Sequence, residues 1–87
     1  MIIKEIQGKV LDIVNLWAEN SFSKIQFGSN LHLISDFGLD SVSLLNVVSD
    51  VEKTFNLVIS DEDISNEKFL EFNSLVTLVS GKLNDII

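Results

Sequence analysis

The chain has 87 residues, 46% of them hydrophobic and 22% charged, a length that predicts one domain over residues 1–87. Its 13 acidic residues outnumber its 6 basic ones, all lysine, and the net charge of −7 argues against nucleic acid as a partner. The lack of cysteine excludes disulfides, thiolate metal sites and cysteine nucleophiles, so we expect a cytoplasmic protein. We expect neither a signal peptide nor a membrane span, because no run of about 18 apolar residues occurs.

A first helix is predicted over about residues 2–18, where apolar residues recur every three or four positions. Gly8 lies inside this segment and disfavours a helix by up to about 1 kcal/mol relative to alanine, so the prediction depends on the apolar stripe. The stripe consists of Ile3, Ile6, Val10, Ile13 and Trp17, widened by Ile2, Val14 and Leu16.

Residues 19–40 are predicted to form a long connection, because Asn, Ser, Asp and Gly recur throughout them. The segment also has many large apolar residues, which a solvated linker does not need. We therefore expect an ordered loop that packs over the core. The apolar anchors are Phe22, Ile25, Phe27, Leu31, Leu33, Ile34, Phe37 and Leu39.

A second helix is predicted from Asp40 or Ser41 to about Phe55, since both Asp40 and Ser41 suit a helix start. At about 100° per residue, Leu45 lies near the edge of the predicted core face. That core face consists of Leu44, Val47, Val48, Val51 and Phe55. The opposite face, which we expect to be exposed, consists of Val42, Asn46, Ser49 and Lys53.

Two further helices follow. Ser60 is a suitable cap for a short third helix over about residues 61–66, and Asn73 or Ser74 opens a last helix. The apolar face of the last helix consists of Leu75, Leu78, Val79, Leu83 and Ile86. Four helices without a convincing strand predict an all-α four-helix bundle with a short third helix.

Residues that could perform catalysis or bind a metal are scarce. His32 is the only histidine and lacks visible partners for a triad or a metal site, so we expect a structural or surface histidine. The acids at 61–63 resemble the start of a calcium loop, but Asn66 replaces the required glycine and Phe72 the required glutamate. We therefore expect acids that cap a helix, no metal site and no catalytic residue.

The most informative stretch leads into the second helix. It combines an apolar loop, a glycine, a serine at the helix start and an apolar residue that faces outward. The stretch reads Asp36-Phe37-Gly38-Leu39-Asp40-Ser41-Val42. It resembles the 4′-phosphopantetheine attachment motif of acyl carrier proteins, and the spacing of later elements extends the resemblance over roughly residues 30–84. The first helix and the long loop also match this family in order and length.

The resemblance implies that a phosphopantetheinyl transferase esterifies Ser41 with 4′-phosphopantetheine from coenzyme A. The thiol of the arm then carries an acyl or aminoacyl group, and Asp40 helps to hold magnesium in the transferase complex. Catalysis belongs to the transferase and to the enzymes that load and process the cargo, so the protein itself is not an enzyme. We expect a monomer whose partner-contact residues are Leu39, Val42, Asn46, Ser49 and Lys53.

The pathway is less defined than the carrier role. Carriers of fatty-acid synthesis usually line the second helix with glutamates, whereas here only Asp50 and Glu52 are acidic in it. This difference favours a free-standing carrier in polyketide or nonribosomal-peptide biosynthesis. An acyl carrier protein of fatty-acid synthesis and an unmodified helical interaction module are the alternatives. The sequence leaves open whether the cargo chain folds back between the helices.

Overall fold

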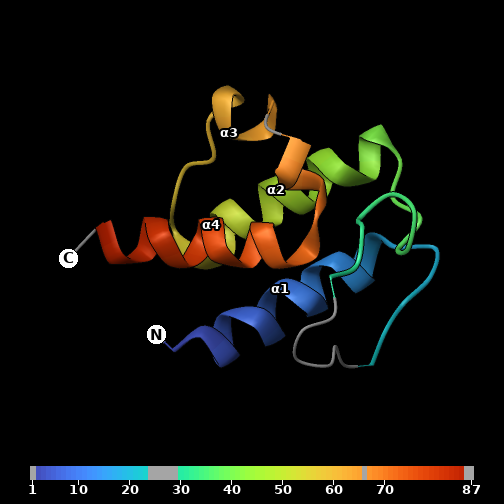
Figure 1. The fold of residues 1–87 in the computed structure, drawn as a ribbon, viewed down its shortest axis with the longest axis horizontal. Coiled ribbons are helices and arrows are strands. Elements are labelled where there is room, and N and C mark those ends of the chain that lie inside the picture. Colours follow the sequence, from blue (N-terminus) through green and yellow to red (C-terminus); the bar gives the residue numbers. More distant parts are fainter. Residues whose placement is uncertain (1, 24–29, 66, 86–87) are drawn as a thin grey trace.

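The computed structural model describes residues 2–23, 30–65 and 67–85. In chain order the elements are α1 (Ile3–Trp17), α2 (Ser41–Phe55), α3 (Asp61–Ser65), the 3-10 helix η1 (Glu67–Leu70) and α4 (Phe72–Asp85) (Figure 1). Within these ranges β structure is limited to an isolated bridge between His32 and Glu71. The predicted all-α four-helix architecture, with its long first connection and short third helix, is confirmed. The sequence did not predict η1, and α4 begins slightly earlier than expected.

The long helices pack around a shared core. Helix α1 contacts both α2 and α4, whereas α3 contacts η1 and stands away from α1 (Figure 1). In this view the start of α2 lies at the opposite end of the molecule from the start of α1 and the end of α4. No helix in the described ranges is long and apolar enough to cross a membrane.

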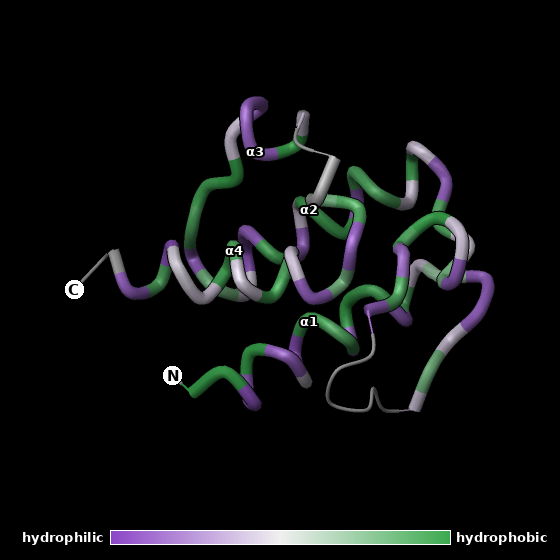
Figure 2. The backbone as a smooth tube through the Cα atoms, in the orientation of Figure 1, coloured by the Kyte–Doolittle hydropathy of each residue, from purple (hydrophilic) through white to green (hydrophobic). Residues whose placement is uncertain are grey.

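The core draws on the loop between α1 and α2 as well as on the helices. Phe37 is fully buried, and its ring lies edge-on to Phe22, with ring centroids 4.9 Å apart. It also lies 5.9 Å from Phe72 at the start of α4. Figure 2 shows hydrophobic and hydrophilic residues alternating along the helices, as amphipathic packing requires. The bundle therefore closes over an aromatic cluster to which a loop residue is central.

Helix α1 buries much of its predicted stripe, including Ile6, Val10 and Val14. Leu16, which was expected to widen this stripe, is 70% exposed, because it lies about 120° around the helix from Val10. The prediction was also wrong for Ile2 and Ile3, which are 63% and 60% exposed and precede the first buried residue of the helix, and Trp17 is 37% exposed.

The long loop packs against the core, as predicted, in the part that the structure describes. Ile34 is an exception at 44% exposed, because it lies on the outer side of a tight turn. Two other anchors, Ile25 and Phe27, lie outside the described residues. The buried or partly buried anchors are Leu33, Phe37, Leu39, Phe22 and Leu31.

Backbone hydrogen bonds tie this loop to the start of α4. The Leu33 N–H donates to the Leu70 carbonyl at 2.7 Å, and the Phe72 N–H donates to the Leu31 carbonyl at 2.8 Å. Such pairing between segments far apart in sequence is not visible in local patterns. It fixes the loop that precedes α2 against η1 and α4.

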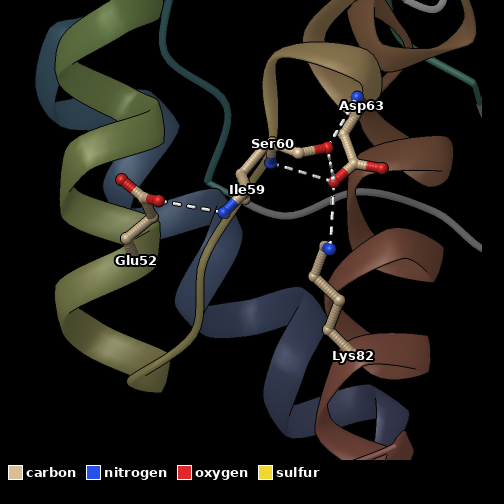
Figure 3. A network of polar contacts seen from close by, with 5 residues as sticks. All are labelled: Glu52, Ile59, Ser60, Asp63 and Lys82. Atoms are coloured by element: carbon tan, nitrogen blue, oxygen red, sulfur yellow. Dashed lines mark hydrogen bonds and ion pairs between the residues drawn. The ribbon is translucent and has the colours of Figure 1, made fainter.

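Polar side chains hold the connection from α2 to α3 (Figure 3). The Glu52 carboxylate of α2 accepts a hydrogen bond from the Ile59 N–H at 2.9 Å. Ser60 caps α3, as predicted, because its hydroxyl accepts from the Asp63 N–H at 3.1 Å. Asp63 in turn accepts from the Ser60 N–H and hydroxyl, and it pairs with Lys82 of α4 at 2.9 Å. Helix α3 itself has no buried residue.

Candidate functional site

Ser41 is the first residue of α2 and is exposed. The helix begins there because Asp40 adopts an extended backbone and caps the helix, accepting the Ser43 N–H on Oδ1 at 2.8 Å. The same Ser43 N–H, followed by the Ser43 hydroxyl, holds the pKa of Asp40 below its ordinary value. Asp40 is thus an anionic cap beside an accessible hydroxyl.

The residues before Asp40 form a tight turn, which we call the pre-serine turn (residues 32–39). His32 Nδ1 accepts the N–H groups of Ile34 and Ser35, at 3.1 and 3.2 Å. The His32 N–H donates to Asp36 Oδ2 at 2.6 Å. The histidine therefore has the structural role that was one of the two expected.

Backbone bonds reinforce the pre-serine turn along its length. The Asp36 N–H donates to the His32 carbonyl at 2.9 Å, and the Leu39 N–H donates to the Leu33 carbonyl at 3.1 Å. Leu33 and Leu39 are also buried, at 0% and 2% exposed. The turn is consequently anchored in the core immediately before the cap of α2.

Glu19 and Asn20, in the segment after α1, contact the same turn. Gly38 has φ +76°, and a Cβ at this position would lie 3.1 Å from Glu19 Cβ. The Asn20 N–H donates to the Phe37 carbonyl at 3.0 Å, and Asn20 Nδ2 donates to the Asp36 carbonyl at 3.3 Å. Sequence reasoning missed Glu19 and Asn20, because contacts across so many residues leave no local signal.

The exposed side of α2 next to Ser41 is partly apolar. Val42 is 68% exposed, as predicted, but Leu45 is 61% exposed and does not border the core. At about 100° per residue Leu45 lies between Ser41 and Val42, so its angle was a usable signal. Leu44 is only partly buried at the margin of the core. The predicted core residues that are buried are Val47, Val48, Val51 and Phe55.

One predicted partner-contact residue is not on the surface. Leu39 is 2% exposed, because the pre-serine turn directs its side chain into the core beneath the start of α2. Lys53 is exposed, and Asn46 and Ser49 are partly exposed. Lys53 makes no ion pair with any residue that the structure describes.

Another contact fixes α2 against the end of α1. Trp17 Nε1 donates to Asp50 Oδ2 at 2.8 Å, from the last residue of α1 to the third turn of α2. Asp50, one of the two acids in the second helix, is therefore engaged within the molecule. This leaves fewer free carboxylates on α2 than its sequence alone suggests.

The arrangement is suited to presenting a hydroxyl at the start of α2. The Nδ1 lone pair of His32 is occupied by backbone donors, and the described residues include no group of three that could hold a metal ion. A phosphate ester at Ser41 would meet the positive end of the α2 dipole, and the glycine turn leaves the serine accessible. These residues fit a phosphate-linked prosthetic group.

Comparisons with known proteins agree with this geometry. Residues 11–80 match the family described as "Phosphopantetheine attachment site". The chain is 34% identical over 82 residues to "Acyl carrier protein" of Cyanidium caldarium, covering 94% of this chain and 91% of that protein. It is 40% identical over 50 residues to "Acyl carrier protein homolog" of Mycoplasmopsis pulmonis (strain UAB CTIP), covering 58% and 66%. No solved structure matches significantly. The chain therefore belongs to the acyl carrier protein family, as a carrier rather than an enzyme, with a covalently attached 4′-phosphopantetheine group.

Proposed function

We propose that Ser41 carries the 4′-phosphopantetheine arm and that the protein holds acyl or aminoacyl intermediates on it. The single observation that supports this most is the exposed hydroxyl of Ser41 at the first position of α2. The arm, when attached, supplies the thiol that forms the thioester. The chain supplies a fixed and accessible attachment point at a helix N-terminus.

Asp40 and the pre-serine turn have separate roles next to Ser41. Asp40 caps α2 through Oδ1, and its lowered pKa keeps the carboxylate ionised and able to hold magnesium in the complex with the transferase. The pre-serine turn keeps Ser41 in place, and the Nδ1 atom of its histidine is already occupied by backbone donors. Activation of the hydroxyl therefore falls to a separate phosphopantetheinyl transferase.

Partner enzymes contact the exposed side of α2 in this proposal. Val42 and Leu45 provide the apolar part, and Asn46, Ser49 and Lys53 the polar part. Loading and processing enzymes reach the arm by docking there, next to its attachment point. Leu39 does not contact partners in this proposal, because its side chain is buried in the core and supports the turn.

We propose that this carrier acts as a monomer in the cytoplasm, in polyketide or nonribosomal-peptide biosynthesis. The support is the shortage of free acids on α2, where Asp50 bonds to Trp17, Glu52 bonds to the Ile59 N–H and Lys53 is exposed. Fatty-acid synthesis is the alternative, and both curated relatives are named acyl carrier proteins without a pathway.

The attachment site is tested by intact-protein mass spectrometry after incubation with coenzyme A, magnesium and a promiscuous phosphopantetheinyl transferase. We expect one added arm on the wild type and none on Ser41→Ala. Ser35→Ala, in the same region but exposed and without a side-chain hydrogen bond among the described residues, is the matched control and should be modified fully. An unmodified wild type with several transferases would favour the helical interaction module instead.

The pathway is tested on the modified protein with two kinds of loading enzyme. We expect an adenylation or polyketide acyltransferase enzyme to load the arm faster than a malonyl transferase of fatty-acid synthesis. Faster loading by the fatty-acid enzyme would place the carrier in that pathway.

A further inference from the structure

His32 holds the pre-serine turn through a nitrogen that must be unprotonated. The backbone N–H groups of Ile34 and Ser35 can only donate, so His32 Nδ1 accepts both with its lone pair. In an imidazolium both ring nitrogens carry protons and neither accepts. Protonation of His32 therefore removes two of the hydrogen bonds that shape the turn.

The contact has the form of a helix cap with histidine in the capping position. The side chain accepts the N–H groups two and three residues ahead, and the Asp36 carboxylate accepts the His32 N–H at 2.6 Å. A capping box is reciprocal in the same way. Asn, Asp, Ser and Thr normally provide this cap with an oxygen, and such an acceptor is insensitive to pH between about 5 and 8. Histidine is the residue type that changes charge in that range.

The turn is continuous with the attachment point. It starts at His32 and is closed by the Gly38 N–H, which donates to the Ile34 carbonyl at 3.0 Å. Leu39 follows in the core, and Asp40 then caps α2. A loss of order at Ile34 is transmitted along a short backbone path to the residues that set the position of Ser41.

We infer that His32 is a positioning residue, whose unprotonated imidazole maintains the turn that presents Ser41, so that acidification slows attachment of the arm. This inference rests on the proposed function of Ser41. The sign follows from the geometry, because a falling pH removes the acceptor and the two N–H donors then face a cation. The turn is fully formed on the alkaline side and weakens on the acidic side.

Among the side chains that the structure describes, carboxylates lie in the turn and on the segments packed against it. Asp36 belongs to the turn and bonds to the His32 N–H, Glu71 forms the backbone bridge to His32 and accepts from the Ser74 hydroxyl, and Glu19 packs against Gly38. As a class, side-chain carboxyls titrate at lower pH than imidazoles.

The test compares transferase kinetics of the wild type, His32→Asn and His32→Ala between about pH 5.5 and pH 8. Asparagine places Oδ1 on the γ carbon, where histidine has Nδ1, and so keeps an acceptor that does not titrate. At about pH 8 we expect the wild type and His32→Asn to be alike, and kcat/KM of His32→Ala to be about fivefold lower. At about pH 5.5 we expect the wild type to fall about fivefold relative to His32→Asn, through KM rather than kcat, because fewer molecules present the serine correctly.

Dividing kcat/KM of the wild type by kcat/KM of His32→Asn at each pH removes the pH dependence of the transferase itself. Ser35→Ala keeps its backbone N–H, so its kcat/KM should follow that of the wild type. A ratio that stays flat from about pH 5.5 to pH 8 would overturn the inference.

A second measurement does not depend on attachment of the arm. It is the rate of amide hydrogen exchange at Ile34 and Ser35 in the unmodified protein, divided by the rate in His32→Asn at the same pH. We expect this ratio to rise about fivefold on acidification. If the arm never attaches yet this ratio rises, the proposed function fails while the histidine cap stands. If the exchange ratio is flat, the inference fails whatever the transferase does.

Discussion

The pre-serine turn and helix α3 lie on either side of α2 in the chain, and they are held in different ways. The turn is bonded through its backbone and buries Leu33, Phe37 and Leu39. Helix α3 buries none of its residues, and its fixed points are the Ser60 cap and the ion pair between Asp63 and Lys82. The end of α2 that presents the serine is therefore fixed by the core, whereas α3 is fixed by contacts that water competes for.

This difference follows from the energetics of the two kinds of contact. Removing a buried aromatic side chain costs about 3–5 kcal/mol, whereas a partly exposed ion pair contributes about 1 kcal/mol or less. Substitutions in the turn should therefore act on the whole fold, and substitutions around α3 should act locally. Four measurements can test this contrast.

The largest effect is expected from Phe37→Ala. This ring is fully buried between Phe22 and Phe72, so its loss should lower the free energy of unfolding by about 3–5 kcal/mol. Urea unfolding measures the change. Ile34→Ala, in the same turn but 44% exposed, is the control and should cost about 1 kcal/mol or less. Equal costs for the two variants would contradict a core-anchored turn.

Two glycine substitutions should have opposite signs. Gly38→Ala places a Cβ at φ +76° and 3.1 Å from Glu19 Cβ, so we expect a loss of about 1–3 kcal/mol. Gly8→Ala, inside α1 with no atom within 4 Å of the new Cβ apart from its chain neighbours and the backbone of its own helix, should stabilise the protein by about 0.5–1 kcal/mol. Thermal unfolding followed by circular dichroism compares them. Stabilisation by both would show that Gly38 tolerates a side chain.

The smallest effect is expected from Lys82→Met, which removes the ion pair of Asp63. We expect global stability to fall by about 1 kcal/mol or less, with faster amide hydrogen exchange confined to α3. Lys53→Met is the matched control, since Lys53 is exposed and forms no ion pair within the described ranges. Equal exchange in both variants would mean that the pair does not hold α3.

The same ion pair predicts a dependence on pH. The Lys82 ammonium, followed by the Ser60 N–H and hydroxyl, lowers the pKa of Asp63 from 3.8. A lowered pKa stabilises the fold when the carboxyl is ionised, so the contribution is complete at neutral pH and disappears as pH falls through the folded-state pKa below 3.8. The stability advantage of the wild type over Asp63→Asn, measured by urea unfolding, should therefore shrink in acid. An advantage that persists there would contradict this assignment.

Local patterns were sufficient to predict the helices and the start of α2. Asp40 and Ser41 suit a helix start by their chemistry, and the angle of Val42 placed it on the exposed side before any contact was known. Ser60 was predicted as a cap for the same kind of reason. These features depend on residues within one or two turns of each other.

The contacts that support the site could not be predicted in this way. Asn20 bonds to the carbonyls of Asp36 and Phe37, and Leu33 bonds to Leu70, across distances in sequence that leave no periodic trace. The burial of Leu39 depends on the path of the whole turn. The angular positions of the residues within α2 do not include that path. Burial of loop residues is set by tertiary packing, whereas the direction of helix residues is set largely by the helix.

The contact between Trp17 and Asp50 gives the protein an optical signal of its own. Trp17 is the single tryptophan of the chain, it is 37% exposed, and its indole N–H bonds to α2 from the end of α1. Its fluorescence emission therefore reports on the junction of the two helices that flank the long loop. Changes in how these two helices pack together can be followed at this junction without a label.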